Sequence, residues 1–430
     1  MTPENVLHYL SDHEKHARAS ISFVPSENTM SPISRLPFIL DNYSRYHFDY
    51  KPMSQAFRGD RGIDKIKEEI LIPLLQELTK AEFINLKGIS GMNCLTVVLA
   101  ALTDIGDTVI SIPANMGGHP STPMIAKRLG IRLLDMPMLS PHDLDLDRLE
   151  TMIKKEKPRL IYIDQSTFLF PIDPMPVRQL VDQHSPATLI HFDSSHLNGL
   201  VLGGACWNAL DRGADSFGGS THKTLPGPHK TFLASNQKEI IEKINDKMIY
   251  FVSHIHAAGL VSLTLVLLEM KHCGCADYAK TVVENSRAFA SLLHRHEKLH
   301  VAEAERGFTD CHQLWVTPEL DNDPWEITDR LHRCGLLINN FDALPGINAH
   351  TFRLSMAEAT KLGLKTEEVK ELAEIFIQGL DTGVAEKDVA ERVKGWRLKH
   401  PKPEYGFTEE KLKTIDFPFP LEQFLQIFNP

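Results

Sequence analysis

The stretch that decides the fold is residues 191–230, which read HFDSSHLNGLVLGGACWNALDRGADSFGGSTHKTLPGPHK. An apolar strand ends in an acid, Asp193, and a polar turn presents one lysine, Lys223, about 30 residues later. Either residue alone has an ordinary explanation, because acids often cap turns and most lysines are solvated. Together they suit pyridoxal phosphate (PLP) chemistry, in which an acid keeps the ring nitrogen protonated and a lysine forms an imine with the aldehyde.

The chain has 430 residues, so two domains, or one large domain with a satellite, are expected. Its hydrophobic fraction of 42% and charged fraction of 24% are typical of a soluble globular protein. A net charge of -10 disfavours a general nucleic-acid binder. No apolar run approaches the roughly 20 residues that span a bilayer, and residues 1–15 lack a signal-peptide pattern. Six dispersed cysteines indicate reduced thiols, so we expect a cytoplasmic protein without nucleic-acid or membrane partners.

One group of residues invites a metal interpretation. Cys273 to Cys275 form a Cys-Gly-Cys sequence with His272 beside it and His254 and His256 upstream. This spacing matches no standard zinc pattern, and a helix end explains it better. We therefore expect no metal site.

Short apolar strands alternate with helices through the middle of the chain. The predicted strands are 108–112, 131–134, 160–163, 188–192 and 216–219, and the predicted helices are 62–86, 88–102, 123–129, 146–156 and 240–270. This rhythm predicts an α/β fold with a mostly parallel sheet covered by helices on both faces. A smaller α/β unit is predicted to follow, with strands at 307–316 and 336–339 and helices at 365–379 and 385–398.

Four segments describe the expected domain organisation. They are an N-terminal arm (1–50), a large PLP-binding domain (51–285), a small C-terminal domain (286–395) and a C-terminal tail (396–430). The arm starts with a short helix, and residues 23–28 look too polar for a core strand.

Polar residues follow the predicted strands, where ligands of an open parallel sheet collect. Ser90-Gly91-Met92 enters a helix whose N–H groups and dipole favour a phosphate, although a plain N-cap explains the serine equally well. In Gly117-Gly118-His119, the histidine is a candidate to stack on an aromatic ring or to pack in a loop. Ser166 ends another strand, where its hydroxyl is placed to donate to the cofactor's phenolate oxygen. The series continues in chain order with Asp193, His196 and Lys223.

Four motifs resemble those of serine hydroxymethyltransferase, a fold-type I PLP family, and the resemblance covers nearly the full chain. They are Val24-Pro25-Ser26-Glu27-Asn28, Gly117-Gly118-His119, Asp193-Ser194-Ser195-His196-Leu197-Asn198-Gly199-Leu200 and Thr221-His222-Lys223-Thr224-Leu225-Pro226-Gly227-Pro228. The last is the most specific. The resemblance implies an aspartate aminotransferase-like large domain, a smaller α/β domain, PLP as cofactor, and a homodimer with shared active sites.

The resemblance also implies roles for individual residues. Lys223 would carry the Schiff base, Asp193 would pair with the pyridinium nitrogen, and His119 would stack on the ring. The other implied cofactor contacts are Ser90, Gly91 and Met92 at the phosphate, Ser166 and His196 at the phenolate oxygen, and Thr221 and His222 beside the lysine.

The substrate side is implied in the same way. Ser26 and Arg353 would bind the amino acid, and the planar guanidinium of Arg353 suits bidentate binding of a carboxylate. Tyr46 and His256 would reach the cofactor of the partner subunit.

One departure separates the chain from the hydroxymethyltransferases, whose arm carries a Tyr-x-Glu element for folate-linked one-carbon transfer. Residues 42–49 read NYSRYHFD here. Aligning on Tyr43 places Arg45 at the glutamate position, and aligning on Tyr46 places His47 or Phe48 nearby. Neither alignment supplies a carboxylate. Two other segments depart in the same way, namely the GFTDCHQ sequence at 307–313 and residues 386–403. Together with the arm, they resemble the L-threonine transaldolase branch.

Members of that branch cleave threonine to a PLP-bound glycine carbanion and acetaldehyde, and then add the carbanion to another aldehyde. A β-hydroxy-α-amino acid is the expected product here. His119, His47 and a cofactor-bound water are candidates for the base, and residues 342–350 are a candidate lid. Alternatives are threonine aldolase or hydroxymethyltransferase activity, diversion of the carbanion to elimination, cyclisation or oxidation, and a non-catalytic PLP-fold protein.

Overall fold

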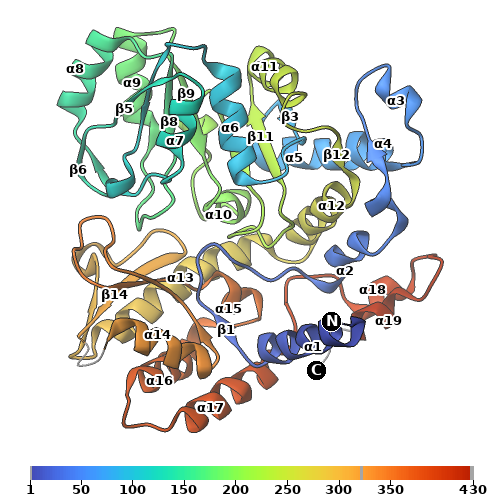
Figure 1. Cartoon of the computed structure of the whole chain (residues 1–430), viewed down its shortest axis with the longest axis vertical. Helices are drawn as coiled ribbons and strands as arrows, with labels where there is room; N and C mark the ends of the chain where they lie inside the picture. The colour runs from blue at the N-terminus through green and yellow to red at the C-terminus, as the bar shows by residue number, and fades with distance from the viewer. Residues whose placement is uncertain (1, 320–322, 427–430) are drawn as a thin grey trace.

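The computed structural model describes residues 2–319 and 323–426, so the last four residues of the predicted tail lie outside them. Figure 1 shows a larger α/β unit built from the blue to yellow part of the chain and a smaller one built from its yellow to red part. This arrangement agrees with the predicted α/β fold, in which a large domain with a mostly parallel sheet is followed by a smaller α/β domain.

The large unit is built on a seven-stranded sheet with the order β3-β11-β10-β9-β8-β4-β5. The strands are β3 (Phe83–Asn85), β4 (Thr108–Ser111), β5 (Arg132–Asp135), β8 (Leu160–Ile163), β9 (Leu189–Asp193), β10 (Ser216–Ser220) and β11 (Thr231–Ser235). The five from β10 to β5 run parallel, as predicted. β11 pairs antiparallel with both β10 and β3, and neither β3 nor β11 was predicted.

Helices cover both faces of this sheet, because consecutive strand residues point to opposite sides. Val109 and Leu160 face a core shared with α6 (Gly91–Leu102), α7 (Thr122–Arg128) and α11 (Lys238–Met248). Ile110 and Ile161 face the opposite core. The helices on that side are α5 (Ile72–Thr79), α8 (Leu146–Glu156), α9 (Pro174–His184), α10 (Asn198–Leu202) and α12 (Ala257–His272).

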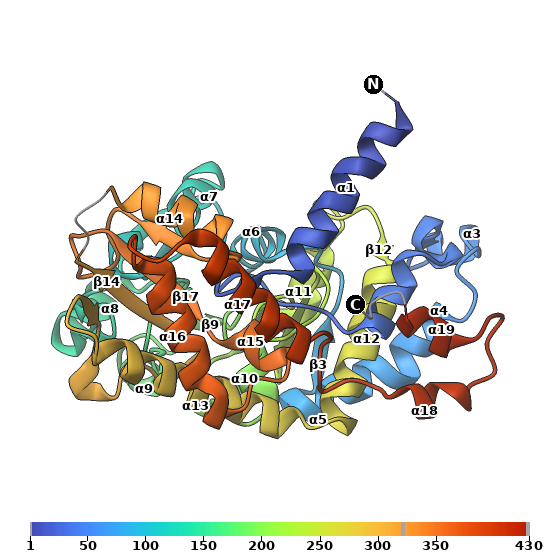
Figure 2. The ribbon, with the colours of Figure 1, turned by 90° about the horizontal axis from the view of Figure 1, so that it is seen from below.

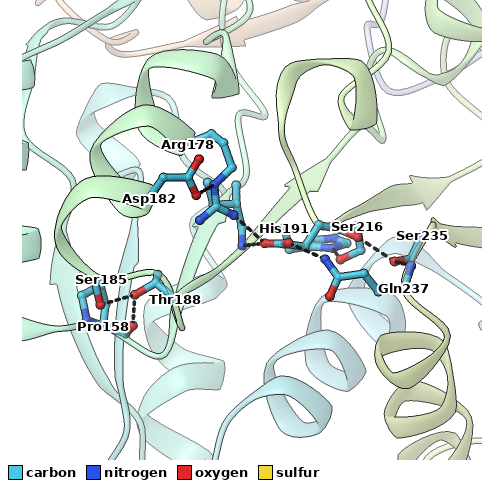
Figure 3. Close-up of polar contacts among 11 residues, drawn as sticks. Pro158, Arg178, Asp182, Ser185, Thr188, His191, Ser216, Ser235 and Gln237 are labelled. Carbon is cyan, nitrogen blue, oxygen red and sulfur yellow. Dashed lines mark hydrogen bonds and ion pairs between the residues drawn. The ribbon is translucent and has the colours of Figure 1, made fainter.

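Polar contacts hold β9 and β10 in place (Figure 3). The Asp215 side chain accepts hydrogen bonds from the Ile190 amide at 2.7 Å and from Arg178 at 3.2 Å. His191 Nδ1 shares a hydrogen bond with the Ser216 hydroxyl at 2.8 Å. These contacts involve the start of β10 and the middle of β9. They hold together the two strands that lead to Asp193 and Lys223.

The smaller unit has a four-stranded antiparallel sheet with the order β13-β14-β17-β16. Its strands are β13 (Leu299–Val301), β14 (Gln313–Pro318), β16 (Asn339–Phe341) and β17 (Thr351–Ser355). Its helices are α13 (Cys275–His294), α14 (Pro324–Arg333), α15 (Ala357–Lys361), α16 (Val369–Leu380) and α17 (Glu386–Lys399). The prediction of a smaller α/β unit is confirmed, although β13, β17, α13, α14 and α15 were not predicted.

The arm is more closely integrated than its polarity suggested. Helix α1 (Pro3–Arg18) projects from the body (Figure 2), and β1 (Ile21–Ser22) pairs in parallel with β15 (Leu336–Leu337). Phe23 is fully buried and stacks on Phe289 at 5.5 Å. The prediction that residues 23–28 stay outside the core is thus wrong for Phe23 and Val24, because the pairing of β1 with β15 brings the residues that follow β1 inside.

The remaining short elements surround the large unit. They are α2 (Pro32–Arg35), β2 (Tyr46–His47), α3 (Met53–Ala56), α4 (Ile63–Lys65), β6 (Met138–Ser140), β7 (Asp143–Leu144), β12 (Ile255–His256), α18 (Glu409–Lys413) and α19 (Leu421–Gln426). The strand β2 pairs antiparallel with β12. Cys275 opens α13, so the Cys-Gly-Cys sequence lies at a helix junction, as expected.

Three further predictions need correction. The expected helix 240–270 consists of two helices, α11 and α12, because β12 interrupts it. The expected helix 62–86 consists of α4, a π-helical turn at Ile66–Leu71 and α5, and it ends at Thr79 because the residues that follow form β3. The expected strand 307–316 begins only at Gln313. Gly307 and Phe308 adopt left-handed backbone angles, with φ of 82° and 74°, which a strand does not allow.

Among the described residues, no single helix is both long and apolar enough to cross a bilayer. α12 and α13 pass that test only as a pair bent by 84°. Most residues of α12 are buried in the fold, which accounts for their apolar character.

Candidate active site

A cavity of about 190 Å3 lies where the parallel strands of the large sheet end. The ends of β8, β9 and β10 and the start of α6 contribute to its walls. Its lining residues are Ser90, Gly91, Met92, Leu95, His119, Tyr162, Asp164, Gln165, Ser166, Asp193, Ser195, His196, Ser220, His222 and Lys223. Most of the predicted cofactor contacts thus meet at one edge of the sheet, as the topology requires.

Lys223 follows β10 in a turn whose backbone is held on both sides. Asn28 Nδ2 donates to the Lys223 carbonyl at 2.6 Å, and the Tyr278 hydroxyl donates to the next carbonyl at 2.9 Å. Burial lowers the pKa of the Lys223 amine to about 8, while Asp193 opposes this shift and Arg353 adds to it. A neutral, nucleophilic amine is therefore available near neutral pH.

Asp193 ends β9 with both carboxylate oxygens engaged. The Tyr162 hydroxyl donates to Oδ2 at 3.1 Å, and the Ser195 amide donates to Oδ1 at 2.9 Å. Tyr162 is fully buried and stacks on His191 at 5.2 Å. Burial raises the pKa of the Tyr162 phenol well above its ordinary value, so this group remains a donor to the carboxylate.

The N-terminus of α6 forms another wall of the cavity. Ser90 caps this helix by accepting a hydrogen bond from the Asn93 amide at 3.2 Å. Gly91 leaves room for a ligand, because a Cβ there would lie 3.3 Å from Ser220 Cβ. The Ser220 hydroxyl is buried and has no hydrogen-bond partner among the residues that the structure describes. A free hydroxyl beside a helix N-terminus suits a phosphate.

His119 enters the cavity from the loop after β4. Its ring Nδ1 accepts a hydrogen bond from the Ser121 amide at 3.2 Å, and its own amide donates to the Asp164 carbonyl at 3.2 Å. Burial lowers the pKa of His119, so the ring is neutral and carries its proton on Nε2. Burial also raises the pKa of Asp164 well above its ordinary value, and its carboxyl group accepts a hydrogen bond from the Thr122 hydroxyl.

Arg353 lies on β17, and its side chain reaches across to the large unit. Its Nη1 donates to Thr167 Oγ1 at 3.0 Å, and its Nη2 lies 3.3 Å from Asn339 Oδ1. Within residues 2–319 and 323–426, no carboxylate forms an ion pair with this buried guanidinium, and its Nε has no partner. Burial lowers the pKa of Arg353 to about 10, and a carboxylate ligand would compensate for that burial.

Three observations test whether PLP fits this cavity. A lysine amine and a carboxylate share its wall, an unpartnered hydroxyl faces the helix N-terminus, and a buried arginine next to it lacks an acid. PLP and its substrate need these four groups. The lysine binds the aldehyde, the acid pairs with the protonated ring nitrogen, the hydroxyl binds the phosphate, and the arginine binds the carboxylate of the amino acid. The residues present therefore fit the cofactor.

The structure does not bring all predicted residues to this cavity. Tyr46 and His256 face each other across the β2–β12 pair, where both are exposed. His47 is buried beside a smaller pocket, and its Nδ1 pairs with Asp60. Within one chain, none of these three residues lines the cavity that contains Lys223.

Two more predicted residues lie outside the lining. The Thr221 hydroxyl donates to the Pro228 carbonyl at 2.7 Å, so it closes the lysine turn and does not face the cavity. Ser26 lies half-buried in the loop that also carries Asn28. The candidate lid approaches the site, because Pro345 Cγ would lie 3.9 Å from a Cβ on Gly117.

Sequence reasoning missed several residues of the site. Tyr162 was assigned only to an apolar strand, and Ser220 only to the polar turn that presents Lys223. Nothing local marks either residue, because their importance depends on the neighbouring strand. His312 and Gln313 were noted as part of a family-like sequence and of a predicted strand, but no role at the site was assigned to them. Both form hydrogen bonds to His196, on its side away from the cavity.

Comparison with known proteins agrees with this geometry. A family model described as serine hydroxymethyltransferase matches residues 1–376. An L-threonine:uridine-5'-aldehyde transaldolase from Amycolatopsis is 36% identical over 375 residues, covering 86% of this chain and 90% of that protein. The serine hydroxymethyltransferase of Sulfolobus acidocaldarius is 29% identical, with 95% of each chain covered. The fold matches an L-threonine transaldolase from Pseudomonas fluorescens, solved in its internal aldimine state, with a TM-score of 0.86, 23% identity and 96% of each chain covered. The chain is therefore a PLP-dependent enzyme of the serine hydroxymethyltransferase family.

Proposed function

We propose that this protein is an L-threonine transaldolase. It cleaves the Cα–Cβ bond of threonine, releases acetaldehyde, and forms a new β-hydroxy-α-amino acid from a second aldehyde. The observation that carries the proposal is the arm, which lacks the carboxylate that a folate-dependent enzyme needs. Alignment on Tyr43 places Arg45 there, and alignment on Tyr46 places His47 or Phe48 nearby. In addition, Arg45 Nε donates a hydrogen bond to Asp41 Oδ2 at 2.8 Å. The relatives named as transaldolases support the same conclusion.

The bound PLP supplies a positively charged ring that accepts the electrons of the broken bond. Arg353 would bind the substrate carboxylate, Asp193 would keep the ring nitrogen of the cofactor protonated, and Lys223 would hold the cofactor through its amine. Because His119 carries its proton on Nε2, it meets the substrate as a donor rather than as a base. Removal of the hydroxyl proton then falls to a water molecule, because the His47 side chain is fully buried in its own chain and pairs with Asp60.

A cytoplasmic homodimer with shared active sites is part of the proposal. Tyr46 and His256 are exposed on the β2–β12 pair, away from the cavity of their own chain. The arm and its neighbours also expose large apolar side chains, which a partner surface would cover. They include Val6, Leu7, Tyr9, Leu10, Tyr43, Tyr46, Phe57, Tyr250 and Phe251.

The proposal is tested by adding L-threonine to the PLP-loaded enzyme, with and without a second aldehyde. Acetaldehyde release that rises when uridine-5'-aldehyde or an aromatic aldehyde is present, with formation of the matching β-hydroxy-α-amino acid, supports transaldol transfer. Acetaldehyde release that ignores the second aldehyde indicates a threonine aldolase. Serine cleavage that requires tetrahydrofolate indicates a hydroxymethyltransferase, the second candidate on the basis of the family match. Lys223→Ala is the control that abolishes each activity.

A further inference from the structure

A chain of buried polar side chains runs from the cavity into the small domain. His196 lines the cavity, and His312, Gln313 and Ser355 lie behind it. His312 immediately precedes β14, which Gln313 opens, and Ser355 ends β17, the strand that also carries Arg353. All four side chains are at most 4% exposed.

Distances show that these groups form one hydrogen-bonded array. His196 Nδ1 lies 3.2 Å from His312 Nε2 and 3.4 Å from Gln313 Nε2. His312 Nδ1 lies 2.8 Å from Ser355 Oγ, which also accepts from the Ala357 amide at 3.1 Å. The two imidazole rings are nearly parallel, with an interplanar angle of 17°.

The Gln313 amide decides where the protons lie. Its Nε2 is 3.1 Å from the Ser166 carbonyl oxygen, which can only accept a hydrogen bond, so the nitrogen and not the oxygen must face it. The second hydrogen of this amide then points towards His196 Nδ1. That ring nitrogen must therefore be an acceptor, and the proton of neutral His196 must lie on Nε2.

The contacts of His312 fit the same assignment. If Ser355 donates its hydroxyl hydrogen to His312 Nδ1, the proton of His312 lies on Nε2, where it donates to His196 Nδ1. The opposite arrangement would require a proton on His196 Nδ1, which would then face the amide hydrogen of Gln313. Two donors would meet there in a buried site, at a cost of about 1–3 kcal/mol.

We infer that His312 and Gln313 are positioning residues that hold His196 in the Nε2–H form and thereby present a fixed N–H donor to the cavity. In the region that the structure describes, Nε2 of His196 has no hydrogen-bond partner within the protein. Burial keeps both rings neutral, because it lowers the pKa of His312 to about 3 and that of His196 well below its ordinary value.

The inference rests on the proposed PLP site, where His196 meets the negatively charged ring oxygen. An N–H donor stabilises that oxygen and so disfavours the proton shared between the oxygen and the lysine nitrogen. The array therefore lowers the pKa at which the visible absorbance of the bound cofactor changes. Lys223, Arg353 and His119 also influence His196 electrostatically, and the variants below leave all three in place.

The test is a spectrophotometric pH titration of the PLP-loaded enzyme and three variants. His312→Leu removes the donor to His196, and His312→Gln keeps an N–H near the same place. His142→Leu is the matched control, because it removes another buried neutral histidine that lies outside the cavity. In His312→Leu, the pKa of the absorbance change rises by about one unit, and the dissociation constant of PLP increases about tenfold. His312→Gln returns towards the wild-type values, and His142→Leu matches them.

One outcome overturns the inference: His312→Leu binds PLP and titrates like His142→Leu. If His312→Leu does not fold, Gln313→Met removes the second donor, and an upward shift of the same pKa supports the inference whereas an unchanged pKa overturns it. Failure of the transaldolase proposal shows in the acetaldehyde assay and leaves this titration unchanged, whereas failure of the assigned PLP site looks different from both. In that case, Lys223→Ala retains the visible band of the wild type, or the wild type never acquires one.

Discussion

Lys223 has an amine that burial poises for reaction, since its pKa is lowered to about 8. Only the neutral amine attacks an aldehyde. The rate at which the cofactor-free protein captures PLP should therefore rise about tenfold per pH unit below 8 and level off above it. Stopped-flow absorbance between pH 6 and 9.5 measures this rate, with Lys223→Ala as the variant that forms no covalent adduct. A rate that does not change with pH would contradict the assigned pKa.

Tyr162 supports the acid that faces the cofactor ring. Tyr162→Phe removes the donor 3.1 Å from Asp193 Oδ2 but keeps the aromatic ring that stacks on His191. A hydrogen bond to a charged group contributes about 1.5–3 kcal/mol, so kcat/KM for threonine should fall about 10- to 100-fold. Tyr43→Phe, at an exposed tyrosine, is the control and should leave kcat/KM unchanged. If the two variants had equal kcat/KM, the assigned role of Tyr162 in supporting Asp193 would be wrong.

The residues that the sequence could identify are those whose chemistry shows locally. Asp193 and Lys223 stand out because one ends an apolar strand and the other is the lysine of a polar turn. Tyr162 and Gln313 do not stand out, because each acts only on a neighbour from a distant part of the chain. His47 stands out by its motif, yet the fold of a single chain places it away from Lys223.

At the scale of elements, helix α10 is packed directly against the lysine segment. A Cβ on Gly199 would lie 2.2 Å from the Thr224 carbonyl oxygen, and backbone atoms cannot yield as a side chain can. Gly199→Ala should destabilise the protein by about 1–3 kcal/mol and weaken PLP binding, because the turn that carries Lys223 must move.

The control for this prediction is another helical glycine. Gly395 lies within α17, and a Cβ there would meet nothing within 4 Å. Gly395→Ala should therefore stabilise the protein by about 0.5–1 kcal/mol, by removing backbone freedom from the unfolded chain. Chemical denaturation of both variants measures the two changes. The contact assigned to α10 would be wrong if Gly199→Ala were as stable as Gly395→Ala.

The elements that the sequence predicted well are those with a clear period. Leu146–Glu156 and Leu160–Ile163 were predicted with the bounds that the structure shows, because an amphipathic helix and a buried apolar strand leave strong patterns. Phe83–Asn85 was not predicted, because three residues directly after a helix carry no period of their own. Its strand conformation depends on pairing with β11, more than 140 residues later in the chain.

At the scale of the whole molecule, the single chain separates residues that the proposed reaction needs together. The cavity contains Lys223, Asp193 and His119, whereas Tyr46 and His256 lie exposed on the β2–β12 pair. A two-fold dimer offers a way to unite them, because each subunit can then complete the site of the other.

Hybrid dimers test this arrangement directly. Lys223→Ala and Tyr46→Ala should each lose most of the transaldolase activity as homodimers. If sites are shared, a mixed dimer has one site that carries both substitutions and one site that carries neither. Random exchange makes half of all dimers mixed, so refolding the two variants together should restore about a quarter of the wild-type activity. Native mass spectrometry measures the mixed fraction. If each chain builds its own site, no mixed dimer contains an intact site, and activity stays at the level of the separate variants.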